Sequence, residues 1–491
     1  MPSQLSAATL QAPLPYDRAG VTPGIVHLGV GAFHRAHQAV YLDDVLRTDP
    51  SWGIIGASLR RPDTRDALQA QDYLYTLIVR SREGTSTRII GSLLDVLDAS
   101  QQREALIAAM TDPRTRIVSL TVTEKGYCHN PATGQLDPTH PDIVHDLAHT
   151  EAPVSAPGLL VRALELRRER GHPPFTILSC DNLPANGETA HRIVTGFAML
   201  RDPALGAFVE TQVSCPSSMV DRIVPATTDA DRELVATQTG LADSWPVVTE
   251  PFTQWVIEDR FPAGRPALEV VGAQMVADVK PYELMKLRLL NGSHSTLAYL
   301  GYLAGYQYVA EAIGDASFRA LVHGLMTDEA MPTLPDGLGD LGSYRDALLA
   351  RFANPALQHR TYQIAMDGSQ KLPQRLLGTI RARLAMGRPV RRLALGVAGW
   401  MRYVMGNDEA GRTIEVQDPL AVRLRAITDA GGTSAERVVE GLLGVREVFG
   451  DDLPAHPGLH DVLVVHLRSL LSSGSKATVA SLVGHQAQHL V

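Results

Sequence analysis

The sequence predicts an α/β chain in two parts, a parallel-sheet domain followed by a mainly α-helical domain. In the first half, short β-branched runs alternate with helical patterns, as parallel strands joined by crossover helices require. From residue 281 onward the β-branched runs nearly vanish, and long Ala/Leu/Arg-rich segments replace them. With 491 residues the chain exceeds the ~250 to 300 that one hydrophobic core usually supports. We therefore expect two domains, residues 1–280 and residues 281–491.

The predicted elements follow from this alternation and from hydrophobic periodicity. In the first half, strands are predicted at 25–28, 53–58, 116–122 and 175–180, and helices at 36–46, 102–110, 159–170 and 188–200. In the second half, helices are predicted at 344–352, 372–384 and 435–443. The apolar stretch 393–401 is about half of the ~20 residues that span a bilayer, so we interpret it as a buried helix.

Composition excludes several classes of function. The 45 basic and 53 acidic residues give a formal charge of −8, which argues against a nucleic-acid-binding surface. Cys128, Cys180 and Cys215 have no spacing typical of zinc sites and fit a reducing compartment. The first residues lack the basic and apolar runs of a secretory signal. We expect a cytoplasmic protein with no membrane partner, either a monomer or a small homo-oligomer.

A glycine turn follows the first predicted strand. The residues concerned are Gly29, Val30, Gly31, Ala32, Phe33 and His34. Strand, glycine turn and helix start together let backbone N–H groups meet a pyrophosphate, which predicts a Rossmann-type dinucleotide-binding domain. His34 stands where the third glycine of GxGxxG belongs, so the close packing of helix on strand is in question there. A glycine turn that serves packing alone is the alternative.

The segment after the second predicted strand bears on the choice of cofactor. Asp63 would bind ribose hydroxyls and favour NAD, whereas Arg60 and Arg61 could instead hold the 2′-phosphate of NADP. His34 and His37 have a spacing that could bind a metal ion, but no third ligand stands beside them in sequence. We predict no metal site.

Four polar side chains interrupt the apolar segment 281–295. They are Glu283, Lys286, Asn291 and His294, and at about 100° per residue they fall within roughly 140° of one helix. A lysine, an amide and an imidazole together could take a proton from an alcohol and stabilise the resulting oxygen. This pattern predicts interconversion of a secondary alcohol and a ketone. A partly buried helix with solvated polar ends is the alternative.

Several motifs along nearly the whole chain resemble those of one family. They are GVGAFHRAHQAVY at 29–41, SLTVTEKGYC at 119–128, SCDNLPANG at 179–187, MVDRIVP at 219–225, EPFTQWVIED at 250–259 and KLRLLNGSHS at 286–295. These segments are similar to those of the mannitol dehydrogenase family, the polyol-specific long-chain dehydrogenases. The resemblance implies NAD-dependent, metal-independent chemistry with Lys286 as general acid/base. It further implies that Asn182 and Asn291 hydrogen-bond the reacting oxygen and that His294 positions the substrate.

The same resemblance assigns three supporting residues. Glu124 would lie near a proton path, and Asp221 and Glu283 would belong to the polar lining of the substrate site. Two alternatives are structural: Asn182 and the residue before it could cap the following turn, and Asp221 could pair with Arg222.

Local features of the sequence look more like the fructuronate reductases (D-mannonate oxidoreductases) than the hexitol branch of the family. Lys125 and Gln363 stand where mannitol 2-dehydrogenases tend to carry glycine and arginine. Lys371 and Arg375, with Lys125, could supply the cation that a substrate carboxylate needs. Each of these three could equally be a solvated surface charge, and a mannitol 2-dehydrogenase or another hexitol dehydrogenase is the alternative. A non-catalytic dinucleotide sensor is disfavoured because the lysine and both amides remain.

Overall fold

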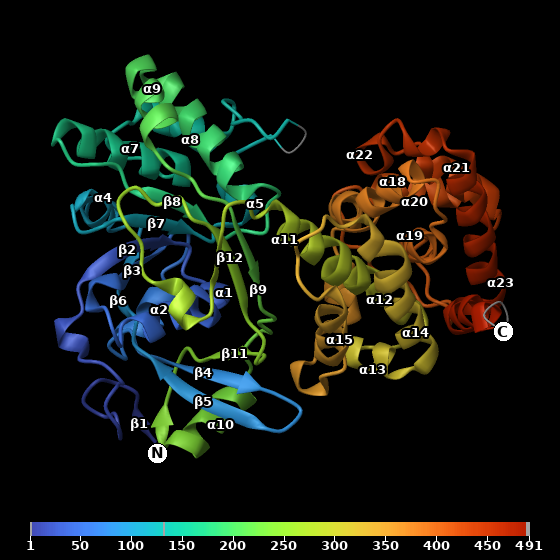
Figure 1. The fold of residues 1–491 in the computed structure, drawn as a ribbon, viewed down its shortest axis with the longest axis horizontal. Coiled ribbons are helices and arrows are strands. Elements are labelled where there is room, and N and C mark those ends of the chain that lie inside the picture. The colour runs from blue at the N-terminus through green and yellow to red at the C-terminus, as the bar shows by residue number, and fades with distance from the viewer. Residues whose placement is uncertain (1, 131–132, 488–491) are drawn as a thin grey trace. The chain divides into compact units, whose positions relative to one another are not determined.

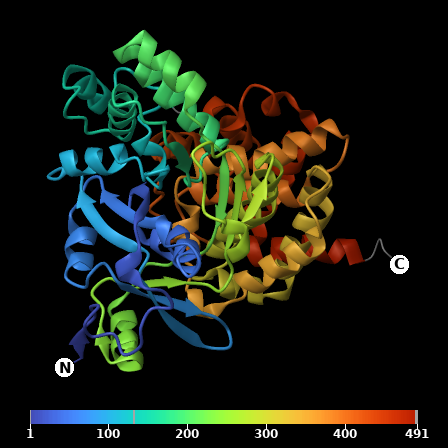
Figure 2. The ribbon, with the colours of Figure 1, turned by 60° about the vertical axis from the view of Figure 1, so that its left-hand side comes forward.

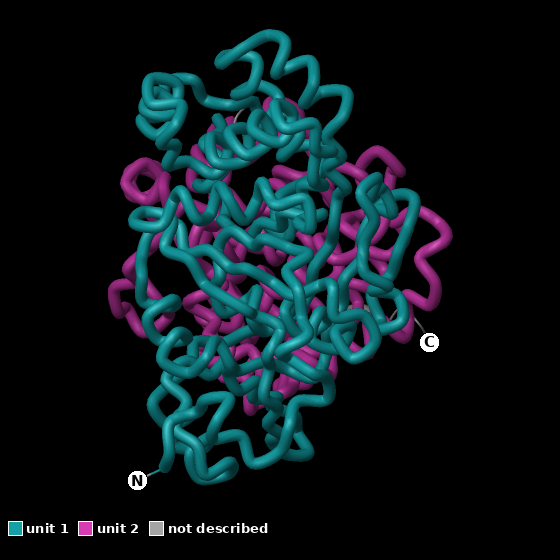
Figure 3. The backbone as a smooth tube through the Cα atoms, turned by 90° about the vertical axis from the view of Figure 1, so that its left-hand side faces the viewer, with its two compact units in different colours: residues 1–280 teal, residues 281–491 magenta. Residues whose placement is uncertain are grey.

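A computed structural model describes residues 2–130 and 133–487. The chain divides into two compact units, Met1–Lys280 and Pro281–Val491 (Figure 3). The first unit is built around a parallel sheet and the second is helical, as the sequence predicts.

The main sheet of the first unit has five parallel strands in the order β6-β3-β2-β7-β8 (Figure 1). These are β2 (Pro23–Leu28), β3 (Gly53–Ser58), β6 (Leu93–Asp98), β7 (Ile117–Leu120) and β8 (Thr176–Ser179). The chain winds outward from β2 to β6 and then returns to the other side of β2. The strand order thus reverses between β2 and β7, and open α/β sheets bind ligands at the carboxyl ends of the strands at such a point.

Helices cover both faces of this sheet (Figures 1 and 2). Successive strand residues point to opposite faces, so Val26 joins the core cluster of one face and Ile25 that of the other. One face packs against α4 (Arg103–Thr111), α7 (Ala156–Glu169), α8 (Asn186–Arg201) and α9 (Pro203–Gln212), and the other against α2 (Gln38–Val45). Burial on both faces explains why these strands read as apolar runs.

The first unit also contains strands that the sequence analysis did not predict. Besides β6, these are β4 (Tyr75–Arg80), β5 (Thr85–Ile90) and β11 (Val247–Thr249) in one small sheet, β9 (Ser218–Asp221), β12 (Gln254–Glu258) and β13 (Gln274–Val276) in another, and the pair β1 (Ser3–Gln4) and β10 (Leu241–Ala242). The remaining helices are α1 (Ala32–Ala36), α3 (Asp63–Gln69), α5 (Thr123–Gly126), α6 (Pro141–Ala148), α10 (Asp229–Thr239), η1 (Arg18–Gly20), η2 (Pro50–Trp52) and η3 (Leu268–Val271).

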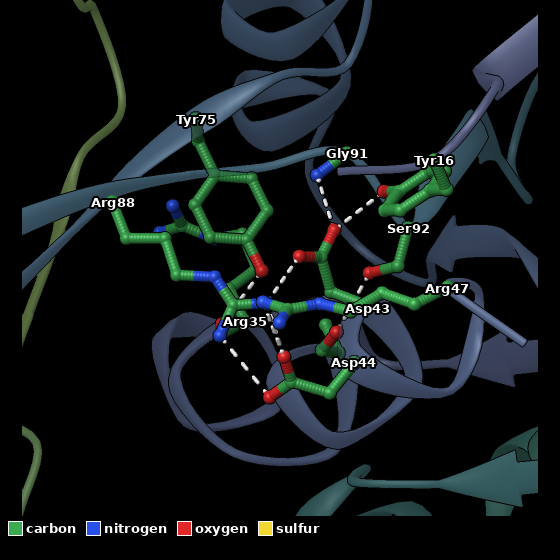
Figure 4. Close-up of polar contacts among 10 residues, drawn as sticks. Tyr16, Arg35, Asp43, Asp44, Arg47, Tyr75, Arg88, Gly91 and Ser92 are labelled. Atoms are coloured by element: carbon green, nitrogen blue, oxygen red, sulfur yellow. Dashed lines mark hydrogen bonds and ion pairs between the residues drawn. The ribbon is translucent and has the colours of Figure 1, made fainter. Parts of the chain in front are cut away.

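A buried carboxylate fastens α2 to β5 and the segment that follows it (Figure 4). Asp43 is fully buried, and its oxygens accept hydrogen bonds from the Tyr16 hydroxyl at 2.5 Å and from the Gly91 amide at 2.8 Å. Arg88 pairs with Asp43 at 2.5 Å and with Asp44 at 2.8 Å. Burial alone would lower the pKa of Arg88, but the hydrogen bonds and charges of the two aspartates raise it. Groups of the chain itself therefore satisfy the oxygens of Asp43.

The second unit has no named strand among its described residues and forms one core around α12 (Gly292–Leu303) and α19 (Arg391–Val404). All of α12 except Tyr302 is buried. The other elements are α11 (Lys280–Met285), η4 (Lys286–Asn291), α13 (Val309–Gly314), α14 (Ala316–Gly324), η5 (Leu325–Ala330), η6 (Met331–Thr333), α15 (Leu341–Phe352), η7 (Pro355–Leu357), α16 (Thr361–Ala365), α17 (Gly368–Leu372), η8 (Pro373–Leu377), α18 (Gly378–Ala385), α20 (Ala421–Gly431), α21 (Ala435–Leu443), α22 (Arg446–Phe449), η9 (Leu453–Ala455) and α23 (Pro457–Ala487).

The predicted segment 393–401 lies inside α19 and is buried throughout, as expected. Within the described ranges, no helix combines the length and the apolar character needed to cross a bilayer.

Candidate active site

The glycine turn lies directly after β2. Gly29 has a φ of +96°, and a Cβ there would lie 2.2 Å from the backbone oxygen of Thr121, so only glycine fits. Gly31 has an extended φ of −103°, and a Cβ there would meet nothing nearer than the Gly29 oxygen at 3.8 Å. The chain itself therefore does not require glycine at position 31. Its absent side chain leaves space beside the turn, which fits the close approach of a pyrophosphate.

His34, in the place of the third glycine, packs against the strand through its ring. It is fully buried, and its ring stacks on that of His27 in β2 with centroids 3.4 Å apart and planes 13° from parallel. Burial lowers the pKa of His27 to about 3 and that of His34 well below its usual value, so both rings are neutral. Helix and strand therefore do pack closely here, with two stacked rings in place of a glycine.

The predicted single helix at 36–46 is wrong. Helix α1 starts earlier, at Ala32, and ends at Ala36, and α2 begins at Gln38. His37 between them has φ −124° and ψ −88°, which no helix allows, and its Nε2 is 2.9 Å from the Gln254 carbonyl oxygen. This long-range contact accompanies the break between the two helices.

A chain of hydrogen bonds holds the turn across β2 and β7. The Thr121 hydroxyl donates to the Gly29 carbonyl oxygen at 2.7 Å, so its oxygen accepts from His27 Nε2 at 2.9 Å. His27 Nδ1 is then left to accept from the Ser119 hydroxyl at 2.8 Å. Sequence reasoning missed His27, although a histidine inside an otherwise apolar strand was a visible signal.

Asp63 is the first residue of α3 and is exposed, as are Arg60 and Arg61 between β3 and α3. All three follow β3, at the edge of the parallel sheet where the neighbouring strand β2 also ends. Asp63, which would bind ribose hydroxyls, and Arg60 and Arg61, which could hold a 2′-phosphate, therefore lie in one segment. The structure does not choose between NAD and NADP.

The two residues of the DN pair after β8 have different environments. Asp181 is buried and accepts hydrogen bonds from the backbone amides of Val122 at 3.1 Å and Thr123 at 2.8 Å, and from the Tyr127 hydroxyl at 2.8 Å. Burial raises the pKa of Asp181, and these hydrogen bonds oppose the rise. Asp181 therefore fastens the preceding loop and α5, on which Glu124 is exposed. Asn182 is exposed beside it.

Asn186 was missed by sequence reasoning and anchors the strand that carries Asp221. Its amide nitrogen donates to the Ser218 carbonyl oxygen at 2.8 Å, and its oxygen accepts from the Ser218 amide at 2.9 Å. Asp221, the last residue of β9, is buried. The guanidinium of the adjacent Arg222 donates to the carbonyl oxygens of Ala36 at 2.5 Å and Glu250 at 3.0 Å.

In the second unit, the segment with the predicted catalytic residues is helical, but not with the assumed pitch. Lys286–Asn291 is a π-helix, in which hydrogen bonds join residues five apart, and the Gly292 amide bonds to Leu287 O. Lys286 and Asn291 were the two extremes of the arc estimated for an α-helix. With the wider turn of the π-helix, these two positions lie about one turn apart on the same side of the helix.

Close packing accompanies the π-helix. A Cβ on Gly292 would lie 2.7 Å from the backbone oxygen of Arg375, which belongs to the second π-helical segment η8. Glycine is required here by the approach of another backbone, and it brings Arg375 to the start of α12.

Two polar side chains at this point have atoms that no described group satisfies. Asn291 and His294 are each 7% exposed, and Asn291 Nδ2 and His294 Nε2 are buried without a hydrogen-bond partner. The His294 ring contacts Phe352 at 4.7 Å. Burial lowers the pKa of His294 well below its usual value, and the neighbouring His359, Arg375 and Arg351 lower it further. Buried polar atoms are rarely unpaired, so these two indicate a ligand.

The predicted cations differ in their partners. Arg375 Nη1 donates to Ser295 Oγ at 3.3 Å, and burial lowers the pKa of the guanidinium. Across the described residues no carboxylate pairs with Arg375. Lys371 Nζ donates to the carbonyl oxygens of Met366 at 2.6 Å and Ile364 at 3.4 Å, so it also fixes the chain before α17. Glu283 and Lys286 are half-buried on α11 and at the start of η4.

One cluster of metal-ligand side chains occurs within the described ranges, and the sequence analysis did not single it out. The ligand atoms of Cys128, His140 and Asp142 lie within 4.8 Å of one another. However, His140 Nδ1 accepts the Asp142 amide at 3.2 Å, and burial raises the pKa of Cys128 to about 12. The His140 imidazole therefore has only its other nitrogen left for a ligand.

Comparison with known proteins identifies close relatives along the whole chain. The mannitol dehydrogenase Rossmann domain matches residues 23–270, and the mannitol dehydrogenase C-terminal domain matches residues 278–471. The chain is 48% identical over 474 residues to D-mannonate oxidoreductase of Escherichia coli (strain K12), covering 95% of this chain and 97% of the relative. It is 41% identical to mannitol 2-dehydrogenase of Pyricularia oryzae, covering 95% and 94% of the two chains.

The fold also matches solved structures. The ternary complex of Pseudomonas fluorescens mannitol 2-dehydrogenase with NAD and D-mannitol aligns with a TM-score of 0.88 at 40% identity, covering 98% of this chain and 99% of that one. A substrate-free D-sorbitol dehydrogenase aligns with a TM-score of 0.89 at 35% identity, covering 98% and 100%.

Proposed function

The chain belongs to the mannitol dehydrogenase family, and on that premise we propose that it interconverts D-mannonate and D-fructuronate. It is an NAD-dependent dehydrogenase that acts on a CH–OH group of a polyol or sugar acid. The relatives include both a D-mannonate oxidoreductase and mannitol 2-dehydrogenases. The choice between an acid and a neutral substrate therefore rests on this chain's own residues.

One observation carries the choice of a sugar acid. Arg375 is a largely desolvated cation beside the π-helix of Lys286 and Asn291, and no described carboxylate pairs with it. A buried charge without a counter-ion is costly. A substrate carboxylate would remove that cost and would bind the guanidinium through charge-assisted hydrogen bonds. Lys371 is the second proposed cation, although its ammonium already holds two carbonyl oxygens.

The proposed chemistry gives each of the predicted polar residues a role. In the oxidative direction, bound NAD supplies the hydride acceptor. Lys286 takes the proton of the substrate alcohol at Nζ, and the amides of Asn291 and Asn182 donate hydrogen bonds to the oxygen as its charge develops. Neutral His294 orients the substrate, and Glu124 relays the proton from Lys286 towards solvent.

The remaining proposed assignments concern the cofactor and the lining of the site. The first domain, residues 1–280, holds NAD at Gly29, Val30, Gly31, Ala32, Phe33 and His34, with Asp63 on the adenosine ribose. The second domain, residues 281–491, carries the substrate site, and Asp221 and Glu283 complete its lining. The three cysteines are free, and we propose a cytoplasmic enzyme that is a monomer or a small homo-oligomer.

A second candidate substrate pair is D-mannitol and D-fructose. It is favoured by the 40% identity to a mannitol 2-dehydrogenase whose structure contains D-mannitol. A neutral hexitol, however, would leave Arg375 without a counter-ion.

Initial rates with D-fructuronate, D-tagaturonate, D-fructose and D-mannonate, each with NADH/NAD and NADPH/NADP, test the proposal. One charged hydrogen bond contributes ~1.5 to 3 kcal/mol, so kcat/KM for D-fructuronate should exceed that for D-fructose by about 10- to 150-fold. A preference for D-fructose and D-mannitol would replace the proposal by the second candidate.

The assignment of Asp63 predicts a change in cofactor preference. The native enzyme should prefer NADH, and Asp63→Ala should reduce that preference, because the carboxylate repels a 2′-phosphate and binds a ribose hydroxyl. The ratio of kcat/KM for NADH and NADPH measures the change. An unchanged ratio in Asp63→Ala would remove Asp63 from the cofactor site.

A further inference from the structure

The loop before α16 is held by two backbone hydrogen bonds and carries a histidine that sequence reasoning did not identify. The Val309 amide donates to the His359 carbonyl oxygen at 3.0 Å, and the Thr361 amide donates to the Gln307 carbonyl oxygen at 3.0 Å. The backbone of His359 and Thr361 is thus bonded to the first residue of α13 and to Gln307. Within this frame the His359 ring meets the His294 ring edge-on, with centroids 5.0 Å apart and planes at 88°.

Like His294 and Asn291, His359 has a buried side-chain nitrogen that lacks a hydrogen-bond partner. Its Nδ1 is buried without a described partner, as are His294 Nε2 and Asn291 Nδ2. A single buried atom without a partner can reflect local strain, but three on residues at one end of α12 indicate a missing ligand. All three are nitrogen atoms, and Asn291 Nδ2 is a donor whichever tautomers the two rings adopt.

The charges around the two rings are all of one sign. The charged groups that act on His359 are Arg375 and Lys371, and those that act on His294 are Arg375 and Arg351. No acidic side chain of the described chain is among them. Burial, followed by Arg375 and Lys371, lowers the pKa of His359 to about 4, so the ring is neutral at pH 7. A neutral ring in a positive environment can bind an anion without adding a proton.

We propose that His359 is a substrate-binding residue that hydrogen-bonds, through Nδ1, an oxygen of the carboxylate held by Arg375. The carboxylate as ligand rests on the proposed function, whereas the contact of His359 with the substrate does not. The Arg375 guanidinium supplies the charge and His359 supplies a directed donor. Together they specify a sugar acid at the end of the substrate site that faces α16 and η8.

The test compares two substitutions of His359 in the full-length enzyme with NADH. His359→Leu removes the donor, whereas His359→Asn keeps an amide near the position of Nδ1. We expect His359→Leu to raise KM for D-fructuronate about 10-fold or more, with little change in kcat, and His359→Asn to restore most of the loss. Arg360→Gln, on the exposed neighbouring side chain, is the matched control and should leave KM unchanged.

The outcomes separate this inference from the proposed function. If the native enzyme prefers D-fructose, the carboxylate assignment fails, but His359→Leu should still raise KM for D-fructose through a lost neutral hydrogen bond. An unchanged KM for both ketoses in His359→Leu would overturn the inference. Equal losses in the Leu and Asn variants, together with a lower Tm in both, would also overturn it and make His359 structural.

Discussion

The polar cluster around Asp43 in the first unit and the one around Asn291 and His294 in the second are both buried, but they differ in what satisfies them. The hydroxyl of Tyr16, the amide of Gly91 and the guanidinium of Arg88 occupy the oxygens of Asp43 (Figure 4). Asn291 Nδ2 and His294 Nε2 meet no described group. A closed network stabilises the fold, whereas an open one leaves donors ready for a ligand. Mutation of the two clusters should therefore affect different properties.

The largest expected effect is the loss of turnover on removing the proton-transfer group. Lys286→Ala should lower kcat by ~10² to 10⁴, the range for general acid–base catalysis. Its Tm and its affinity for NADH should remain close to those of the native enzyme, because the substitution leaves the core of the second unit intact. Steady-state kinetics, NADH titration and thermal melting measure these three quantities. Native turnover in the purified variant would exclude Lys286 as the acid/base.

In the cluster around Asp43, the expected effect of mutation is a loss of stability. Asp43→Ala leaves the Gly91 amide and the Tyr16 hydroxyl without their acceptor, and it leaves Arg88 with Asp44 alone. We expect a loss of about 3 kcal/mol in the free energy of unfolding of the first unit, the lower end for a broken buried pair because Arg88 is partly exposed. Below the melting transition, kcat should be unchanged.

Asp44→Ala is the matched control for that loss. Asp44 pairs with the same arginine, but both side chains are about one third exposed, so its removal should cost about 0 to 1 kcal/mol. Urea titration followed by circular dichroism compares the two variants. Equal destabilisation by both would mean that burial does not distinguish the two carboxylates.

A smaller effect on KM and on stability is expected from the close packing beside the cluster of Asn291 and His294. Gly292→Ala would place a Cβ 2.7 Å from the Arg375 backbone oxygen, so η8 must move away from the start of α12. Overpacking of this kind costs about 1 to 3 kcal/mol, and the displacement of Arg375 should raise KM for the acid substrate. Gly314→Ala is the control, since a Cβ there meets nothing within 4 Å. If Gly292→Ala kept native KM and Tm, the position of Arg375 would not depend on this contact.

Four of the five strands of the parallel sheet, all except β6, could be predicted from the sequence because their signals are local. The predicted strand 53–58 coincides with β3, and the predicted helix 435–443 coincides with α21. In both, the pattern of buried residues and the flanking residues agree with the fold. Helix α2 was less predictable, because the break at His37 involves Gln254 on a distant strand.

The catalytic segment was predicted as a helix with the right polar residues, but its π-helical turn was not. The wide turn is packed against Arg375, which lies far along the chain. His359 escaped notice for the same reason, because its proximity to His294 exists only in the folded second unit. The sequence thus indicated which residue types carry the chemistry, whereas their convergence depends on tertiary contacts.

The contribution of Arg375 to substrate preference tests the account most directly. The measurement is the ratio of kcat/KM for D-fructuronate to that for D-fructose in the native enzyme, in Arg375→Gln and in Arg388→Gln, which changes an exposed arginine near the end of α18. We predict that Arg375→Gln lowers this ratio by about 10- to 150-fold, through KM for the acid, and that Arg388→Gln leaves it unchanged. A ratio that is the same in all three proteins would contradict the account.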